Sequence, residues 1–245
     1  MKVLITGAAG FQAKSVIERL EKKHELTLFD RAPMETEHRF IQGDITNYDD
    51  VLAACQGQDV VVHMVALVRG RSKNSVSDFA DIMVKGTWHV AEACSKSRVK
   101  RLVNFSSIAA TGWPDDNDHC YKAADHCGFR AADLWYAVAK YLGECVTRAY
   151  REAHGMSIIN LRPGVIANDG ANGEPQPYEG DPLKYRFVYV HAEDVAQSVV
   201  LAVETEKVDY GSYYIVAGRE DSWFDWREPA RDLGYKPQHN WEDLY

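Results

Sequence analysis

The chain has 245 residues, of which 46% are hydrophobic and 26% charged, and it carries a net charge of −8. This composition is typical of a globular protein with one sizeable core, and the acidic balance argues against nucleic acid as a partner, because phosphate binding needs a basic surface. No apolar run is long enough to span a bilayer, and the first residues lack the features of a signal peptide, so we expect a cytoplasmic protein without a membrane partner.

Short apolar segments alternate with amphipathic segments from the amino terminus onward. The predicted strands are residues 2–6, 26–29, 59–63, 101–105, 156–161 and 212–216, and the predicted helices are residues 11–23, 77–97, 134–154 and 193–204. Such alternation requires parallel strands joined by crossover helices. The sequence therefore predicts an α/β protein with a doubly wound parallel sheet, formed by a single domain over residues 1–245.

Two segments depart from this alternation. Residues 167–183 are rich in Gly, Pro, Asn and Asp, which predicts a long loop, and long loops in compact domains are usually functional or disordered. Residues 218–245 are rich in Trp and polar residues and have no clear period, which favours a packed closing segment. We expect the 164–190 loop and the 218–245 tail to form a small C-terminal substrate-binding portion.

The cysteines indicate reduced thiols. Their number is odd and their spacing irregular, which argues against a disulfide framework; they are Cys55, Cys94, Cys120, Cys127 and Cys145. The pairs His119-Cys120 and His126-Cys127 offer four potential zinc ligands. However, no Cys-x-x-Cys spacing is present and adjacent residues rarely bind one ion together, so the sequence predicts no metal site.

A glycine-containing turn follows the first predicted strand and precedes a predicted helix. Its glycines, Gly7 and Gly10, allow a tight turn and a close approach of the backbone to a pyrophosphate, and the helix offers free N–H groups. Ala13 stands where a third glycine often lies and is small enough for close packing of helix on strand. The context predicts a dinucleotide site of the Rossmann type, with contacts from Gly7, Ala9, Gly10, Phe11 and Gln12.

An acidic residue, Asp30, ends the second strand twenty residues after Gly10. Its carboxylate can accept both ribose hydroxyls and would repel a 2′-phosphate, which favours NAD. Arg31 keeps NADP as the alternative, because an arginine can hold a 2′-phosphate. Asp44, within Gly43-Asp44-Ile45, has two interpretations that stay open: a contact with the adenine amino group, or a turn or helix cap.

Tyr136 and Lys140 lie four residues apart in a predicted helix, so both side chains are on one face. A free tyrosine has a pKa of about 10 and is a poor base at neutral pH. A neighbouring cation favours the phenolate and brings its pKa toward the working range. Ser106-Ser107 follows the strand at 101–105, and ligands bind at the carboxyl ends of strands in open α/β sheets.

Taken in order, these motifs resemble the short-chain dehydrogenase/reductase superfamily, in its extended or epimerase/dehydratase-like branch. The matching segments are Thr6-Gly7-Ala8-Ala9-Gly10-Phe11, Asp30, Gly43-Asp44-Ile45, Phe105-Ser106-Ser107, Tyr136-x-x-x-Lys140, Arg162-Pro163-Gly164 and Val190-His191-Ala192-Glu193-Asp194-Val195-Ala196. The resemblance covers nearly the whole chain and implies an NAD(P)-dependent oxidoreductase. Ser107 would orient the substrate, Tyr136 would be the general base or acid, and Lys140 would bind the nicotinamide ribose and lower the pKa of the tyrosine.

The resemblance also implies further cofactor contacts and an oligomeric state. The cofactor contacts are Ile45, Val65, Ala66 and Pro163. Members often form homodimers through the helices that correspond to residues 77–97 and 134–154. Three positions depart from the family pattern: Ala13, Met64-Val65 in place of the usual Ala-Ala, and Met83 where an asparagine commonly supports a proton relay.

The substrate is predicted to be a small molecule. Only 25 residues separate Gly164 from Val190, whereas nucleotide-sugar enzymes of this branch insert a large lobe there. The tail resembles that of uronate dehydrogenases, which oxidise the anomeric hydroxyl of a hexuronic acid to a lactone with NAD. Ile108-Ala109 replaces the sugar-contacting Asn-His of that group at the predicted substrate position.

Three arginines are candidate substrate contacts. Arg162 matches the arginine that pairs with a substrate carboxylate in that group, and its alternative role is to tie the loop to the sheet. Arg69 and Arg71 either face the pocket or are solvated.

Three functions are compatible with these residues. The first is an NAD-dependent dehydrogenase that acts on a hydroxyl of a sugar or sugar acid. The second is a nucleotide-sugar epimerase or dehydratase that retains its NAD, against which the short insertion argues. The third is a non-catalytic NAD(P) sensor, against which the intact Ser107, Tyr136 and Lys140 argue.

Overall fold

The computed structural model describes residues 1–67, 74–113, 120–131, 134–169, 175–177 and 186–240. Arg69, Arg71 and His119 lie outside the described residues. Among the described residues, no helix combines the length and apolarity needed to cross a membrane.

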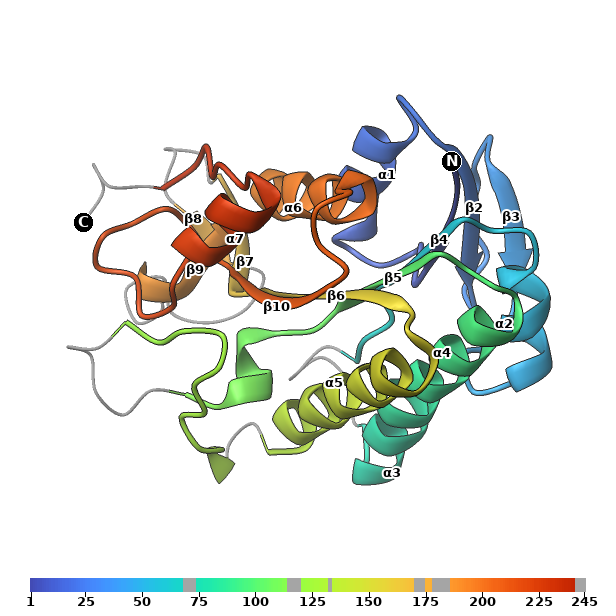
Figure 1. Cartoon of the computed structure of the whole chain (residues 1–245), viewed down its shortest axis with the longest axis horizontal. Coiled ribbons are helices and arrows are strands. Elements are labelled where there is room, and N and C mark those ends of the chain that lie inside the picture. Colours follow the sequence, from blue (N-terminus) through green and yellow to red (C-terminus); the bar gives the residue numbers. More distant parts are fainter. Residues whose placement is uncertain (68–73, 114–119, 132–133, 170–174, 178–185, 241–245) are drawn as a thin grey trace.

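A seven-stranded parallel sheet forms the middle layer, in the order β10-β6-β5-β4-β1-β2-β3 (Figure 1). Its strands are β1 (Lys2–Thr6), β2 (Glu25–Asp30), β3 (Arg39–Gln42), β4 (Val60–His63), β5 (Arg101–Phe105), β6 (Ser157–Pro163) and β10 (Tyr210–Ile215). In β1, Val3 and Ile5 pack in one apolar cluster and Leu4 in the other. The strands are apolar on both sides because helices cover both faces.

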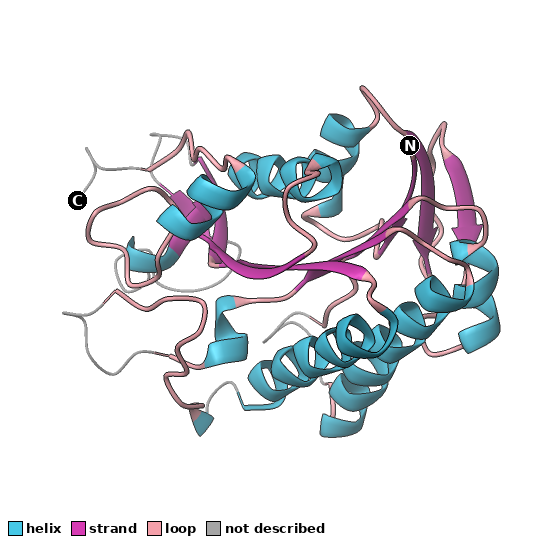
Figure 2. Ribbon diagram, viewed as in Figure 1, coloured by secondary structure: helices cyan, strands magenta, loops and turns pink. Residues whose placement is uncertain are grey.

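The helices form the two outer layers (Figure 2). They are α1 (Ala13–Leu20), α2 (Tyr48–Cys55), α4 (Gly86–Lys96), α5 (Leu134–His154), α6 (Ala192–Glu204) and α7 (Arg227–Leu233). In the views of Figures 1 and 2, α1, α6 and α7 lie above the sheet and α2, α4 and α5 lie below it. The prediction of a doubly wound parallel sheet is confirmed.

A second, three-stranded sheet follows β6, in the order β8-β7-β9. It is formed by β7 (Val165–Asp169), β8 (Pro175–Pro177) and β9 (Tyr189–His191). The prediction of a loop from residue 167 onward is therefore wrong where β7 and β8 lie. These strands are stabilised by pairing between segments distant in sequence, such as Val165 with Tyr189, which local composition does not reveal.

Four other elements differ from the sequence prediction. The expected helix at 77–97 is α3 (Val76–Asp78), then a π-helical segment, Phe79–Lys85, and then α4. The tail with no clear period contains α7, which ends at Gly234 in a left-handed conformation with φ of 79°. Neither β3 nor α2 was predicted as an element.

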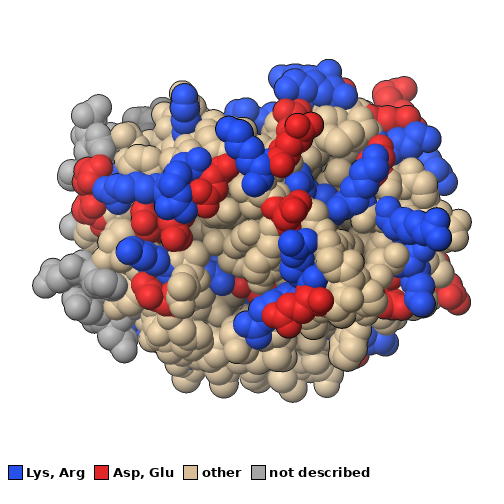
Figure 3. Space-filling model, viewed as in Figure 1, with Lys and Arg blue, Asp and Glu red and all other residues tan. Residues whose placement is uncertain are grey.

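Charged side chains of both signs are interspersed on the surface. On the face shown in Figure 3, Lys and Arg lie beside Asp and Glu, and the described residues of this face form no continuous basic stripe.

Candidate active site

The turn after β1 brings backbone from two strands into contact. Gly7 has a φ of 78°, and a β carbon there would lie 2.9 Å from the backbone nitrogen of Val65, which follows β4. Gly10 donates its N–H to the carbonyl of Gly7 at 3.0 Å and closes the turn before α1 begins. Any side chain at Gly7 would be strained and would clash, so glycine is required for this approach.

A cleft of about 200 Å³ opens beside this turn. Its lining includes the predicted cofactor residues Gly7, Gly10, Asp30, Arg31, Asp44, Ile45, Val65 and Ala66. It also includes Phe29, Gly43, Met64, Leu67 and Ile82, which the sequence did not identify as site residues. Of these, Ile82 lies on the π-helical segment, and only the fold brings it to the cleft.

Asp30 is fixed at the rim of the cleft by backbone donors. One carboxylate oxygen accepts from the N–H of Ala9 at 3.0 Å and the other from Ala32 at 2.9 Å. Each oxygen retains a further lone pair for a hydroxyl. The carboxylate therefore lies where it can accept ribose hydroxyls beside the glycine turn.

Phe11 and Gln12 lie at the start of α1. Phe11 is exposed, whereas the buried Gln12 donates through Nε2 to the carbonyl of Ala192 at 2.8 Å. The Gln12 side chain thus joins α1 to α6. In Phe11 and Gln12, the groups suited to bind a pyrophosphate are therefore the backbone N–H groups at the start of the helix.

Asp44 forms a turn and also lines the cleft. Its Oδ1 accepts from both the N–H and the hydroxyl of Thr46 at 2.8 Å. The backbone hydrogen bond from Thr46 is the main cause that lowers the pKa of Asp44, against the opposing effect of burial. Of the two interpretations, the turn is observed, and an adenine contact stays a prediction.

The predicted catalytic residues come from two elements that meet at the carboxyl end of β5. Ser107 is buried at the start of a 3₁₀ turn, where its Oγ accepts from Ala109 N–H at 3.2 Å. Lys140 Nζ donates to the carbonyl of Phe105 at 2.5 Å and lies 5.9 Å from the ring centroid of Tyr136. Burial lowers the pKa of Lys140 to about 8, and the Glu144 carboxylate opposes this shift.

The candidate substrate residues Arg162 and Ile108 have protein partners. Arg162 forms a two-point ion pair with Glu144, at 2.8 and 2.6 Å, and donates to the Ala123 carbonyl at 2.7 Å. These contacts match its alternative role as a tether, and a substrate carboxylate would have to compete with Glu144. Ile108 is 2% exposed and packs among apolar residues including Trp113, so its side chain is buried in the core and is not open to a substrate.

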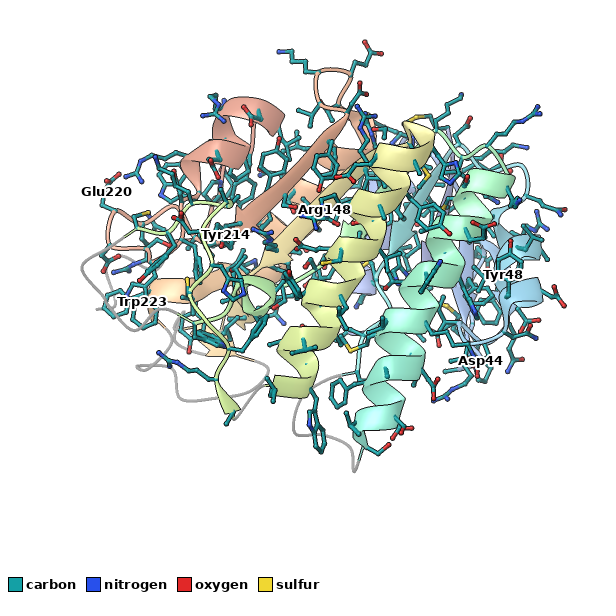
Figure 4. The ribbon with its side chains drawn as sticks, turned by 60° about the horizontal axis from the view of Figure 1, so that its bottom comes forward. Asp44, Tyr48, Arg148, Tyr214, Glu220 and Trp223 are labelled. Atoms are coloured by element: carbon teal, nitrogen blue, oxygen red, sulfur yellow. The ribbon has the colours of Figure 1, made fainter. Side chains whose placement is uncertain are left out.

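Pro163 is the last residue of β6 and is buried beside Ile215 of β10. In Figure 4, Asp44 lies on one side of the molecule, and Tyr214 and Trp223 lie toward the opposite side. Among the described residues, no group of three or more His, Cys, Asp or Glu is arranged to hold a metal ion.

A row of polar side chains crosses the apolar sheet behind Lys140. Paired positions on neighbouring strands carry, in order, Thr6, His63, Asn104, Asn160 and Ser212. His63 Nδ1 lies 2.7 Å from the hydroxyl of Thr6, and Nε2 lies 3.1 Å from the Thr87 hydroxyl, which donates to Met83. Because the Thr87 hydrogen is used, Nε2 carries the imidazole proton and His63 is neutral.

This buried imidazole predicts an acid-sensitive fold. Burial, with Lys140 as a second cause, lowers the pKa of His63 from 6.5 to about 3. Below pH 6.5 the unfolded chain binds a proton that the folded chain does not, so stability falls as the pH drops toward 3. We expect His63 to account for about 2 kcal/mol of lost stability between pH 7 and pH 5.

Urea unfolding of the wild type and His63→Gln at both pH values measures this loss. Glutamine retains one donor and one acceptor but does not titrate. An equal loss in the two proteins would contradict the assignment to His63.

Comparison with known families matches residues 3–180 to the NAD dependent epimerase/dehydratase family. The chain therefore belongs to this family, which confirms the resemblance noted from its motifs.

Two relatives of similar length have names that describe sugar dehydrogenases. L-arabinose 1-dehydrogenase (NAD(P)(+)) of Haloferax volcanii is 25% identical, and the match covers 98% of this chain and 97% of the relative. Uronate dehydrogenase of Pseudomonas putida is 26% identical, with 98% and 85% covered.

Solved structures support the fold. A variant of uronate dehydrogenase from Agrobacterium tumefaciens in complex with NAD is 20% identical, with a TM-score of 0.79 over 97% of this chain and 84% of the other. A structure described as mutated uronate dehydrogenase gives a TM-score of 0.81 at 21% identity, over 99% and 84% of the two chains.

Proposed function

We propose that the protein is an NAD-dependent dehydrogenase that oxidises a hydroxyl of a small sugar or sugar acid. The observation that carries this proposal is the packing of the Tyr136–Lys140 helix on the carboxyl end of β5, where Lys140 Nζ donates to the carbonyl of the residue two before Ser107. The same sheet edge carries the cleft with Asp30. The names of the relatives, which include an arabinose and a uronate dehydrogenase, support the substrate class.

The residues present fit a dinucleotide. Gly7 and Gly10 line the cleft without side chains, and Asp30 offers a carboxylate at its rim that can accept ribose hydroxyls. We propose cofactor contacts from the turn Gly7–Gln12, from Arg31, Asp44 and Ile45, from Val65 and Ala66, and from Tyr136, Lys140 and Pro163. When bound, NAD supplies the acceptor for the hydride.

The protein's own groups would handle the proton and the orientation of the substrate. Ser107 donates a hydrogen bond to the reacting oxygen, and the Tyr136 phenolate accepts the hydroxyl proton as the C–H hydride leaves. The Lys140 ammonium stabilises the phenolate electrostatically. One C–H and one O–H bond break, and the carbon becomes a carbonyl.

The substrate side is proposed to include the 164–190 and 218–245 segments. In the described part of them, Phe187 stacks on Trp223 with 5.2 Å between ring centroids, and Ala217 donates to the carbonyl of Tyr189. Arg162 is paired with Glu144. A neutral aldose, which has no carboxylate, would bind without displacing Glu144 from Arg162. Arg69 remains a proposed contact for an acidic sugar.

We also propose that two copies associate through α4 and α5, which lie side by side in Figure 4. The exposed side chains on this face include Trp88, Trp135 and Tyr141, which are 57%, 50% and 40% exposed. A cytoplasmic location is likewise proposed, in line with the five free cysteines.

The test compares each sugar with each cofactor in a direct absorbance assay. Purified protein is given NAD or NADP with L-arabinose, D-galactose, D-glucuronate or D-galacturonate, and absorbance at the reduced nicotinamide band is followed. Net NADH formation with at least one sugar is expected, with NAD preferred over NADP. No net reduction, together with NAD that copurifies tightly, would favour an enzyme that returns the hydride and would contradict the proposal.

A further inference from the structure

Glu144 occupies a central position one helical turn beyond Lys140 on α5. Its Oε1 accepts from the Ser106 hydroxyl at 2.5 Å and from Arg162 Nε at 2.8 Å, while Oε2 accepts from Arg162 Nη2 at 2.6 Å. The side chains of Arg162 and Glu144 are only 8% and 12% exposed. Charge-assisted hydrogen bonds at such distances, shielded from water, fix the atoms that they join.

The ion pair extends toward the substrate side through Arg162. Its guanidinium carbon lies 5.3 Å from the ring centroid of Tyr214, and the Tyr214 hydroxyl lies 2.7 Å from that of Thr111. Thr111 belongs to the 3₁₀ turn that begins after Ser107. We call residues 106–111 the Ser107 segment. Glu144 is connected to its first residue directly, through the Ser106 hydroxyl, and to its last residue, Thr111, indirectly through Arg162 and Tyr214.

We propose that Glu144 is a positioning residue that keeps Ser107 in register with Tyr136 and Lys140. The proposal rests on the proposed function above. Ser107 comes from the end of β5, whereas Tyr136 and Lys140 come from α5, 29 and 33 residues later. A misplacement of about 1 Å between such groups costs about a hundred-fold in rate, so a rigid tie between the two elements has a large effect.

The charge of Glu144 acts on Lys140 as well. Burial lowers the pKa of Lys140 to about 8, and the carboxylate raises it. Removing the carboxylate lowers that pKa further, so less ammonium is present near neutral pH and the Tyr136 phenolate is less stabilised. The acid limb of the pH–rate profile then moves to higher pH.

Other titratable groups surround this pair. The groups electrostatically linked to Lys140 or Glu144 include His63 on β4, Tyr136 on α5, Arg162 on β6, and Tyr210 and Tyr214 on β10. His63 is neutral above pH 4, and Arg162 stays charged throughout the working range. The pKa of each of Tyr210 and Tyr214 is raised, mainly by burial. A shift of the acid limb between pH 5 and pH 9 therefore reports the Lys140–Tyr136 pair.

Three single variants separate the two effects of Glu144. Glu144→Gln removes the charge and retains the shape, Ser106→Ala removes only the tie to the Ser107 segment, and Glu152→Gln is the control. Glu152 lies on the same helix in an exposed ion pair with Arg148. The readouts are the pH profile of kcat, the melting temperature, and the titration of Lys140 followed by NMR of ¹⁵Nζ-labelled lysine, assigned with Lys140→Arg.

Glu144→Gln is expected to lower the pKa of Lys140 by about one unit and to move the acid limb of kcat upward by a similar amount. Ser106→Ala is expected to lower kcat about ten-fold with an unchanged Lys140 titration. Glu152→Gln is expected to match the wild type in all three readouts. If Glu144→Gln does not fold, the double variant Glu144→Gln/Arg162→Met, which leaves no buried unpaired charge, replaces it, and its expected shift has the same direction but is smaller because the lost Arg162 cation opposes it.

The proposal is overturned if Glu144→Gln, or the double variant in its place, lowers only the melting temperature and leaves the Lys140 titration and the pH profile as in the wild type. It is also overturned if Ser106→Ala retains full kcat. Failure of the proposed function gives a different result: the wild type then forms no NADH with any of the sugars tested. The NMR titration still decides the action of Glu144 on Lys140 in that case.

Discussion

Tyr136→Phe is expected to lower kcat for sugar oxidation by about a thousand-fold, because the phenolate is the proposed acceptor of the hydroxyl proton. Of the described groups at the end of β5, Lys140 donates to the Phe105 carbonyl and Ser107 Oγ accepts from the Ala109 N–H, and neither is a base matched to this proton at neutral pH. Cofactor binding should persist, since the glycine turn and Asp30 line a cleft to which the Tyr136 hydroxyl does not contribute.

Initial rates under saturating NAD and sugar measure the loss, and quenching of tryptophan fluorescence by NADH measures cofactor binding. Tyr141→Phe is the matched control, since Tyr141 is the neighbour of Lys140 on the same helix and is 40% exposed. It should retain wild-type rates. A Tyr136→Phe protein with more than about a tenth of the wild-type kcat would show that the proton leaves by another route.

The parts of the site that were predicted from sequence depend on backbone requirements and on short spacings. Gly7 must be glycine because of its φ and its approach to Val65, so the glycine itself indicates the turn. Tyr136 and Lys140 share a helix face at a spacing of four, which any helix imposes. Asp30 is the last residue of its strand. Such features are local, and they were visible before the fold was known.

The parts that were missed depend on contacts between distant segments. The sequence offered Arg162 as a cation but not its partner, because Glu144 lies on another element and the pair is formed only when α5 packs on β6. Ile82, on the π-helical segment before α4, lines the cleft through the packing of that segment against distant parts of the chain. The polar row from Thr6 to Ser212 needs the strand order and register, which the apolar strand pattern does not contain.

Gly164→Ala is expected to cause the largest loss of stability. Gly164 joins β6 of the large sheet to β7 of the small one, and a β carbon there would lie 1.9 Å from the carbonyl oxygen of Val188. The obstructing atom is backbone, immediately before β9, so it cannot move without displacing the strand that pairs with β7. We expect the free energy of unfolding to fall by about 3 kcal/mol, as in strongly overpacked sites.

Thermal unfolding measures this effect, and about 3 kcal/mol corresponds to a Tm lower by about 9 °C in a chain of this size. Gly143→Ala is the control with the opposite sign. Gly143 lies within α5, where a β carbon would meet Thr87 at an ordinary 3.6 Å. Alanine there should raise stability by about 0.5–1 kcal/mol, since it restricts the unfolded chain and suits a helix. If Gly164→Ala had the wild-type Tm, the close approach of β6 to the segment before β9 would be contradicted. The fixed position of the small sheet beside Arg162 would be contradicted with it.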